Sequence, residues 1–303
     1  MTTHQQISRP DKVLFPGPDL TKADLAAYYD DVAEVMLPHL VSRPLVLHRF
    51  PDGVDDAGFY QKQVPDHAPD FVDTVTVDAD NDRGHVRHLT VGPHDGSHDG
   101  TEILRYLANQ ACVEVHRWLS HADAVDRPDL IVVDLDPPAR GDLTALRRTA
   151  RATRDLFGEI GLTAFLMATG GTGYHVVAPL DRSAGFDEVR TLARDIAAHL
   201  AAADPDNLTT EQRKAKRGSR IFLDVNRNAY GQTAVAPYSP RARHGAPVAT
   251  PIGFDELGRV EPDGYDLTSV RRRLARKDDP WAGIAAHAAA ADSAAAALRG
   301  RTR

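Results

Sequence analysis

The hydrophobic and polar residues of this chain follow two periods. From residue 21 to residue 38, apolar side chains recur at the spacing of one helix face; Thr21 is a good N-cap, and Pro38 ends the pattern. The same spacing predicts helices at 143–160 and 188–203, one beginning near 102, and an alanine-rich one at 285–298. Shorter apolar runs bounded by turn residues predict strands at 44–50, 112–116, 131–136, 164–167, 176–178 and 220–225, with a strand or loop edge at 58–62.

Three segments lack this periodicity. Residues 7–19 indicate an extended entry with proline turns, and residues 204–217 a polar, basic connector. Residues 78–100 are rich in Asp, Gly and His and predict a hairpin or loop. His94 and His98 each begin a His-Asp-Gly string that could suggest a metal site. No third ligand of matching type stands nearby, so a polar loop is the better interpretation.

The strand at 131–136 ends in two acids followed by Pro137 and Pro138, which cannot extend a sheet ladder. Because side chains alternate across a strand, Asp134 and Asp136 point to the same face, where their charges repel unless a cation lies between them. Oxygen ligands without a nearby Cys favour Mg²⁺ or Mn²⁺ over zinc. A pair of solvated acids at a loop edge is the alternative for an isolated Asp-x-Asp.

A third acid, Asp224, lies inside the apolar run 220–225. An unpaired buried carboxylate costs several kcal/mol, so Asp224 needs a cation or strong hydrogen-bond donors. It is therefore a candidate third metal ligand beside Asp134 and Asp136.

The segment from Thr169 to His175 places three glycines between two predicted strands. Glycine lets backbone N–H groups approach a phosphate closely, and Thr169 and His175 would add donors. A glycine-rich hairpin turn without a ligand is the alternative. The segment matches neither the Walker A pattern nor the dinucleotide-binding fingerprint.

Composition narrows the class of protein. The 303 residues are 42% hydrophobic and 26% charged, as in ordinary globular proteins, and the single Cys excludes an internal disulfide framework. Without a signal-peptide core or a membrane-length apolar stretch, we expect a soluble cytoplasmic protein. The net charge of −7 argues against indiscriminate nucleic-acid binding. Residues 211–243, however, hold eight basic and two acidic residues, a local +6 that indicates either a polyanion-binding patch or a solvated charged face.

With these residues assembled, the chain resembles the polymerase domain of bacterial ATP-dependent DNA ligase D and its stand-alone relatives, members of the archaeo-eukaryotic primase superfamily. The resemblance is most specific at 131–138, at the Gly-Gly-x-Gly-x-His turn 170–175, and at 220–247 with its Asp-x-x-Arg-Asn string. It implies a mixed α/β (α+β) primase-polymerase-like fold, with two packed subdomains around a mixed, largely antiparallel catalytic sheet. We expect one catalytic domain over 1–285, divided near 110, and a C-terminal helix and tail over 286–303.

The resemblance also implies roles for individual residues. Asp134, Asp136 and Asp224 would be catalytic and would hold two Mn²⁺ or Mg²⁺ ions. The residues expected to contact or lie near the nucleotide, chiefly its triphosphate, are His116, Thr169, Gly170, Gly171, His175, Arg227, Arg241, Arg49 and Lys62. The residues expected to meet DNA are Lys12 and Lys22, at a 5′-phosphate, and the aromatic pair Phe59 and Tyr60.

The expected activity is template-directed nucleotidyl transfer that fills gaps and processes ends in non-homologous end joining, with ribonucleotides preferred. Partners would be DNA gaps or ends with a 5′-phosphate, nucleoside triphosphates, a separate DNA ligase and an end-binding protein; a nucleoid-associated location follows. One departure is Thr172, where the family often has lysine, and no Lys-x-Asp-Gly ligase motif occurs.

Two other functions remain open at this stage. In a haloacid-dehalogenase-type phosphatase a strand also ends in Asp-x-Asp, but such an enzyme usually has Thr or Val at the position where this chain has Pro138. A catalytically silent nucleic-acid clamp could use the basic segment, but three acids beside a polyanion would cost it affinity.

Overall fold

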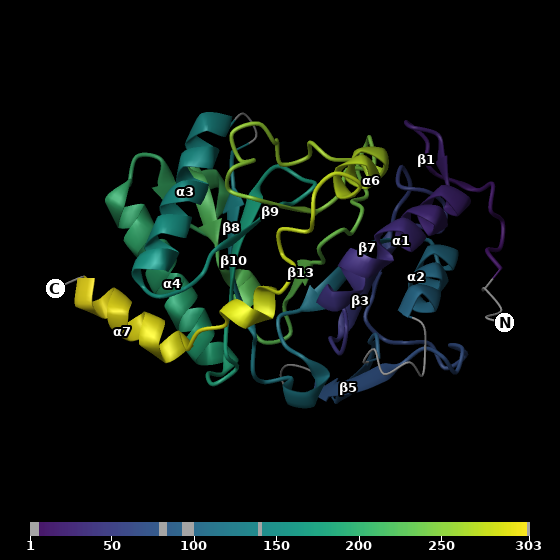
Figure 1. The fold of residues 1–303 in the computed structure, drawn as a ribbon, viewed down its shortest axis with the longest axis horizontal. Coiled ribbons are helices and arrows are strands. Elements are labelled where there is room, and N and C mark those ends of the chain that lie inside the picture. Colours follow the sequence, from purple (N-terminus) through teal and green to yellow (C-terminus); the bar gives the residue numbers. More distant parts are fainter. Residues whose placement is uncertain (1–5, 79–83, 93–99, 139–140, 302–303) are drawn as a thin grey trace. The chain divides into compact units, whose positions relative to one another are not determined.

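The computed structural model describes residues 6–78, 84–92, 100–138 and 141–301, and it divides into two compact units (Figure 1). The first unit comprises Met1–Asp123, Thr233–Thr250 and Tyr265–Asp278, and the second comprises Ala124–Gln232, Pro251–Gly264 and Asp279–Arg303. His94 and His98, considered above as loop residues, lie outside the described residues.

The second unit is built on a six-stranded sheet in the order β11-β12-β8-β10-β9-β14. Strands β12, β8, β10 and β9 pair antiparallel, whereas β11 and β12 pair in parallel, so the sheet is mixed and largely antiparallel as expected. The strand bounds are β8 Leu130–Asp136, β9 Phe165–Ala168, β10 Tyr174–Pro179, β11 Leu208–Thr209, β12 Ile221–Asp224 and β14 Thr250–Ile252.

Two long helices of this unit, α3 (Leu143–Glu159) and α4 (Phe186–Ala203), contact each other and both contact β8, so they cover one face of the sheet (Figure 1). Helix α3 begins where the Asp142 carboxylate accepts the Thr144 N–H at 2.7 Å. Residues 130–133 of β8 are all apolar and buried, so both faces of the strand are covered up to Asp134. The remaining elements of this unit are α5 Lys214–Arg217, η3 Asn226–Asn228, η4 Ile284–His287 and α7 Ala291–Arg301, and η2 Ala122–Ala124 lies where the first unit passes into the second.

The first unit has its own sheet, ordered β13-β7-β3-β6-β5, with β4 paired to β3. Its strands are β3 Leu45–Arg49, β4 Phe59–Gln61, β5 Thr74–Asp78, β6 His85–Leu89, β7 Cys112–Trp118 and β13 Thr233–Val235, beside a separate hairpin of β1 Val13–Phe15 and β2 Leu20–Thr21. Helices α1 (Lys22–Met36) and α2 (Gly100–Asn109) pack together, and α2 contacts β7. The other helices are η1 Leu37–His39 and α6 Leu267–Leu274.

Helix α1 shows why the first unit holds together. Thr21 caps it as predicted, in a capping box with Asp24. Tyr28 and Tyr29, on its buried face, are fully buried, and their hydroxyls donate to the carbonyls of Tyr238 (2.8 Å) and Cys112 (3.1 Å). The helix is therefore tied to two distant parts of the chain at once.

The predicted elements are confirmed in kind, including the hairpin expected at 78–100, where β6 pairs with β5. Strands β5, β13 and β14 and helix α6 were not predicted. The connector 204–217 contains β11 and α5, whose short lengths give no periodic signal. The C-terminal helix α7 starts at Ala291, after the separate turn η4. In the described part of the chain, no helix combines the length and the apolar character needed to span a bilayer.

Candidate functional site

One row of the second unit's sheet carries three of the predicted side chains. His175 on β10 pairs with Asp134 on β8, and Asp134 pairs on its other side with Asp224 on β12. Residues opposite one another in neighbouring strands point to the same face of a sheet, and Asp136 joins them because it stands two residues beyond Asp134. The sheet register therefore gathers these four side chains at the end of β8.

The three acids form a crowded cluster. One carboxylate oxygen from each of Asp134, Asp136 and Asp224 lies within 4.8 Å of the others. Burial, and then the negative charges of Asp134 and Asp224, raise the pKa of Asp136 to about 6. Carboxylates that disfavour one another's ionised form in this way are a fitting donor set for hard divalent cations such as Mg²⁺ or Mn²⁺.

Two basic side chains approach the same cluster. His175 Nε2 lies 3.3 Å from Asp134 Oδ2, and Arg227 Nε lies 3.7 Å from the same oxygen. The side chains of His175 and Asp134 are only 5% and 8% exposed, so solvent screens their contact weakly, whereas the Arg227 side chain is 41% exposed. His175 and Arg227 can thus offset part of the acidic charge and donate to an anion.

Arg227 owes its place to its neighbour Asn228, which is fully buried. The Asn228 amide donates to the Val132 carbonyl at 2.7 Å and accepts from the Val132 N–H at 2.8 Å, so it continues the β8 ladder where β12 stops. A third bond, to the Val225 carbonyl at 2.9 Å, closes the η3 turn. The turn that carries Arg227 is thereby fastened to β8 two residues before Asp134.

The glycine-rich turn folds tightly against the end of β8. A Cβ atom at Gly173 would collide with the carbonyl oxygen of Leu135, so only glycine allows this approach. Thr169 shapes the turn from inside: its hydroxyl donates to the Gly173 carbonyl at 2.8 Å and accepts from the Gly171 N–H at 3.3 Å. Gly170 donates its N–H to the Pro262 carbonyl. The structure therefore brings the turn next to the acids.

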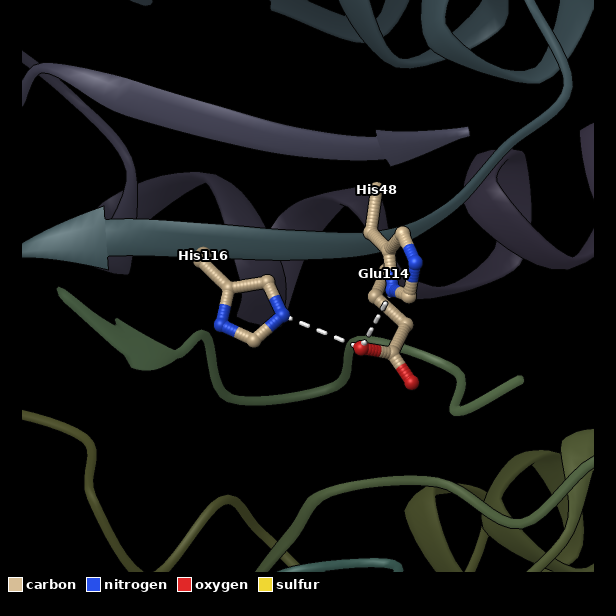
Figure 2. Close-up of side chains that lie close together, drawn as sticks. All are labelled: His48, Glu114 and His116. Atoms are coloured by element: carbon tan, nitrogen blue, oxygen red, sulfur yellow. Dashed lines mark hydrogen bonds and ion pairs between the residues drawn. The ribbon is translucent and has the colours of Figure 1, made fainter. Parts of the chain in front are cut away.

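A second polar cluster lies in the first unit, around His116 on β7 (Figure 2). His116 Nε2 lies 3.0 Å from Glu114 Oε2, and His48 Nδ1 on β3 lies 3.2 Å from the same oxygen. Arg241, another nucleotide-binding candidate of this unit, donates from Nε to Glu114 Oε1 at 3.1 Å. Two of the predicted residues are thus held by one carboxylate.

The predicted aromatic pair is the most exposed apolar feature described. Phe59 and Tyr60 on β4 are 45% and 59% exposed. Arg49 lies over the Phe59 ring at 5.2 Å, while its guanidinium donates to Gln61 (2.6 Å) and twice to Gln110 (both 2.8 Å). Arg49 therefore braces β4 against the end of α2, and the adjacent Lys62 is exposed.

Lys12 and Lys22 lie close together beside α1. Lys12 is ion-paired with Asp52 at 3.0 Å, and Lys22 Nζ donates to Ser8 and Asn109. Burial, then the charges of Lys12, Arg9 and Arg49, lower the pKa of Lys22.

The start of a helix can offer free N–H groups to an anion, but the first three of α1 are already used. The N–H groups of Lys22, Ala23 and Asp24 already donate to Lys12, Pro10 and Thr21, respectively. Any anion bound here would have to rely on side chains.

The sequence analysis missed three residues that organise these clusters: His48, Glu114 and Asn228. The argument applied to Asp224, that an acid inside an apolar strand needs a partner, holds equally for Glu114 in Cys112-Val-Glu-Val-His116 and would have found it. Neither His48 nor Asn228 shows a comparable local signal, because their partners are distant in sequence.

Comparisons with known proteins agree with this arrangement. Residues 21–281 match the family described as LigD, primase-polymerase domain. The chain is 33% identical over 289 residues to the multifunctional non-homologous end joining protein LigD of Pseudomonas aeruginosa, covering 94% of this chain and 33% of that protein. It is 34% identical over 294 residues to the corresponding protein of Mycobacterium tuberculosis, covering 94% and 38%. The chain thus spans little more than a third of these relatives.

A solved structure is also similar. The polymerase domain of Mycobacterium tuberculosis ligase D in complex with DNA matches with a TM-score of 0.85 and 32% identity, over 94% of this chain and 99% of that one. These matches give no support to a haloacid-dehalogenase-type phosphatase. By sequence, fold and the acids at the end of β8, the chain belongs to the family of LigD primase-polymerase domains.

Proposed function

We propose that this chain is a template-directed nucleotidyltransferase that extends DNA 3′ ends at gaps and breaks during non-homologous end joining. The observation that carries the proposal is the row His175–Asp134–Asp224 with Asp136 beside it, on a sheet of the matched family. The relatives' names place them in end joining, and the structural neighbour is described in complex with DNA.

Asp134, Asp136 and Asp224 would hold the two divalent ions. When bound, such ions lower the pKa of an attacking hydroxyl and neutralise the charge of a leaving pyrophosphate. The chain's own residues would bind the phosphates. His175 and Arg227 donate to phosphate oxygens near Asp134, and the glycine-rich turn keeps bulky side chains away from these oxygens. His116 and Arg241 of the first unit would contact the triphosphate. Arginines suit this task because guanidinium forms paired hydrogen bonds with phosphates.

On the DNA side, Phe59 and Tyr60 would stack on bases, each contact contributing about 1–3 kcal/mol. Lys12 and Lys22 would receive a 5′-phosphate, because the positive charges of Lys12, Arg9 and Arg49 act on Lys22 and favour an anion in this region. A separate ligase and an end-binding protein are the proposed partners, in the cytoplasm at the nucleoid.

A primer-extension assay on gapped DNA with Mn²⁺ and with Mg²⁺ tests the activity. Competition between ATP and dATP opposite a template thymine tests the proposed preference for ribonucleotides. We expect ATP to be incorporated in excess, and equal incorporation would contradict that preference. Replacing the exposed Thr172 with lysine should tighten nucleotide binding, because it restores a cation that the family often carries in this turn.

A further inference from the structure

Glu114 is a buried acid, and each of its two carboxylate oxygens has two nitrogen atoms as hydrogen-bond partners. It is 4% exposed and stands directly opposite His48 in the β3–β7 ladder, with His116 two residues along the same face. Its Oε2 atom faces His48 Nδ1 and His116 Nε2, as Figure 2 shows, while its Oε1 atom accepts from Arg241 Nε at 3.1 Å and the Ala242 N–H at 2.9 Å. Four donors thus converge on one carboxylate.

The network keeps Glu114 ionised in spite of its burial. Burial alone would raise the pKa of Glu114, but the hydrogen bond from His116 and the charge of Arg241 hold this pKa well below its ordinary value. A buried charge of this kind orients its partners strongly, because the low surrounding dielectric strengthens each bond.

The His48 side of the network is anchored by aromatic rings. The His48 ring stacks on Tyr60 with a centroid distance of 4.0 Å and an interplanar angle of 12°, and it lies 4.3 Å from the Phe50 ring. Tyr60 also meets the His116 ring edge-on at 5.8 Å. Because His48 is held on two sides, it gives Glu114 a fixed point from which to orient His116 and Arg241.

We propose that Glu114 is a positioning residue for nucleotide binding, which fixes the side chains of His116 and Arg241 for a triphosphate. The inference rests on the proposed function, which assigns both partners to the nucleotide. A divalent ion fits this cluster poorly, because it would displace two hydrogen bonds to one oxygen and lie beside the Arg241 guanidinium. The shared carboxylate therefore acts as a hydrogen-bonding hub.

Glu114→Gln tests the proposal, because it keeps the shape of the side chain but loses the charge and one acceptor. The measurement is calorimetric titration of ATP with Mn²⁺ into the full chain, followed by extension kinetics. We expect ATP to bind at least about tenfold more weakly, which corresponds to about 1.4 kcal/mol. The KM for ATP should rise by the same factor while kcat changes less than about threefold. Glu34→Gln, which alters an exposed carboxylate on α1 of the same unit, should leave both constants unchanged.

His48→Phe is the second variant, in case Glu114→Gln does not fold. It keeps a ring between Phe50 and Tyr60 but removes the nitrogen that faces Glu114, and we expect ATP to bind about threefold more weakly. A purely structural role for Glu114 would lower the melting temperature and the active fraction without moving KM, and would overturn the proposal. Stoichiometric Zn²⁺ binding that is lost in Glu114→Gln would also overturn it, in favour of a metal site. A wild-type chain that binds ATP but extends no primer would contradict the proposed function instead and leave this inference standing.

Discussion

His175 on β10 lies directly opposite Asp134 on β8, and its Nε2 atom is 3.3 Å from Asp134 Oδ2. Asp224 occupies the position opposite Asp134 on the other neighbouring strand. A single carboxylate is therefore flanked by an acid on one side and a base on the other. Within this cluster three acids face one imidazole and one guanidinium, so negative charge remains for divalent cations to neutralise.

The first prediction concerns metal binding by these acids. Asp224→Asn removes one of three crowded carboxylates, so in EDTA this variant should melt at a temperature equal to or above that of the wild type. Wild-type protein should gain about 2.7 kcal/mol at a Mn²⁺ concentration 100 times its Kd, and the variant should lose most of this gain. Thermal melts at pH 7.5, above the pKa of about 6 of Asp136, provide the measurement.

The pH dependence of the Mn²⁺-induced stabilisation follows from the raised pKa of Asp136. As pH falls through about 6, Asp136 takes up a proton that competes with the cation, so the Mn²⁺-induced stabilisation should shrink between pH 7.5 and 5.5. Without metal the sign is opposite, because a carboxyl with a raised folded-state pKa favours the folded state more as it becomes protonated. If Asp224→Asn kept the full Mn²⁺-induced stabilisation at pH 7.5, Asp224 would not be a metal ligand.

The second prediction concerns Asn228. Asn228→Ala leaves the Val132 N–H and carbonyl buried without their partner, so we expect a loss of about 2–4 kcal/mol in the free energy of unfolding, together with weaker extension. The control is Asn226→Ala in the same turn, whose side chain makes an exposed bond to Gln212 and should cost under about 1 kcal/mol. Urea denaturation, followed by a probe in the second unit, measures the free energy of unfolding of both variants. Equal losses would argue against a special role for the hydrogen bonds between Asn228 and Val132.

The third prediction uses two glycines of the second unit. Gly173→Ala places a Cβ against the Leu135 carbonyl, so the turn must move away from the acids and extension should fall at least about tenfold. Gly158→Ala, at an exposed helical position with open space around it, should stabilise α3 by about 0.5–1 kcal/mol and leave extension unchanged. Wild-type extension by Gly173→Ala would show that the turn's position is not critical.

Much of the second unit's site could be predicted from sequence, because its signals are local. The prolines after Asp136 predicted where β8 ends, and Asp224 was recognisable as an acid inside an apolar run. The first unit was harder to predict. Glu114 binds Arg241, 127 residues away, and a pairing over that distance depends on the way β7 and the segment after β13 are brought together. The acceptors of the first N–H groups of α1 could not be predicted either, because Pro10 and Lys12 belong to an irregular segment.

The fourth prediction concerns the 5′-phosphate. Lys12→Ala is the cleaner variant, because Lys22 is buried and its loss would leave Ser8 and Asn109 without their donor. We expect Lys12→Ala to weaken binding of gapped DNA with a 5′-phosphate about three- to tenfold, and of the same DNA with a 5′-hydroxyl less than twofold. Fluorescence anisotropy at one fixed salt concentration is the measurement, since phosphate contacts depend on salt. If wild type bound both substrates equally, Lys12 would be an ordinary surface charge.

The most direct test of the proposed function is extension of a primer across a gap with a 5′-phosphate, in Mn²⁺ and nucleoside triphosphates, by the wild type and by Asp134→Ala. We expect template-directed addition by the wild type, no addition in EDTA, and at least about a thousandfold loss in Asp134→Ala while the variant keeps its fold and its DNA affinity. Near-wild-type extension by Asp134→Ala, or no extension by the wild type, would contradict the proposed function.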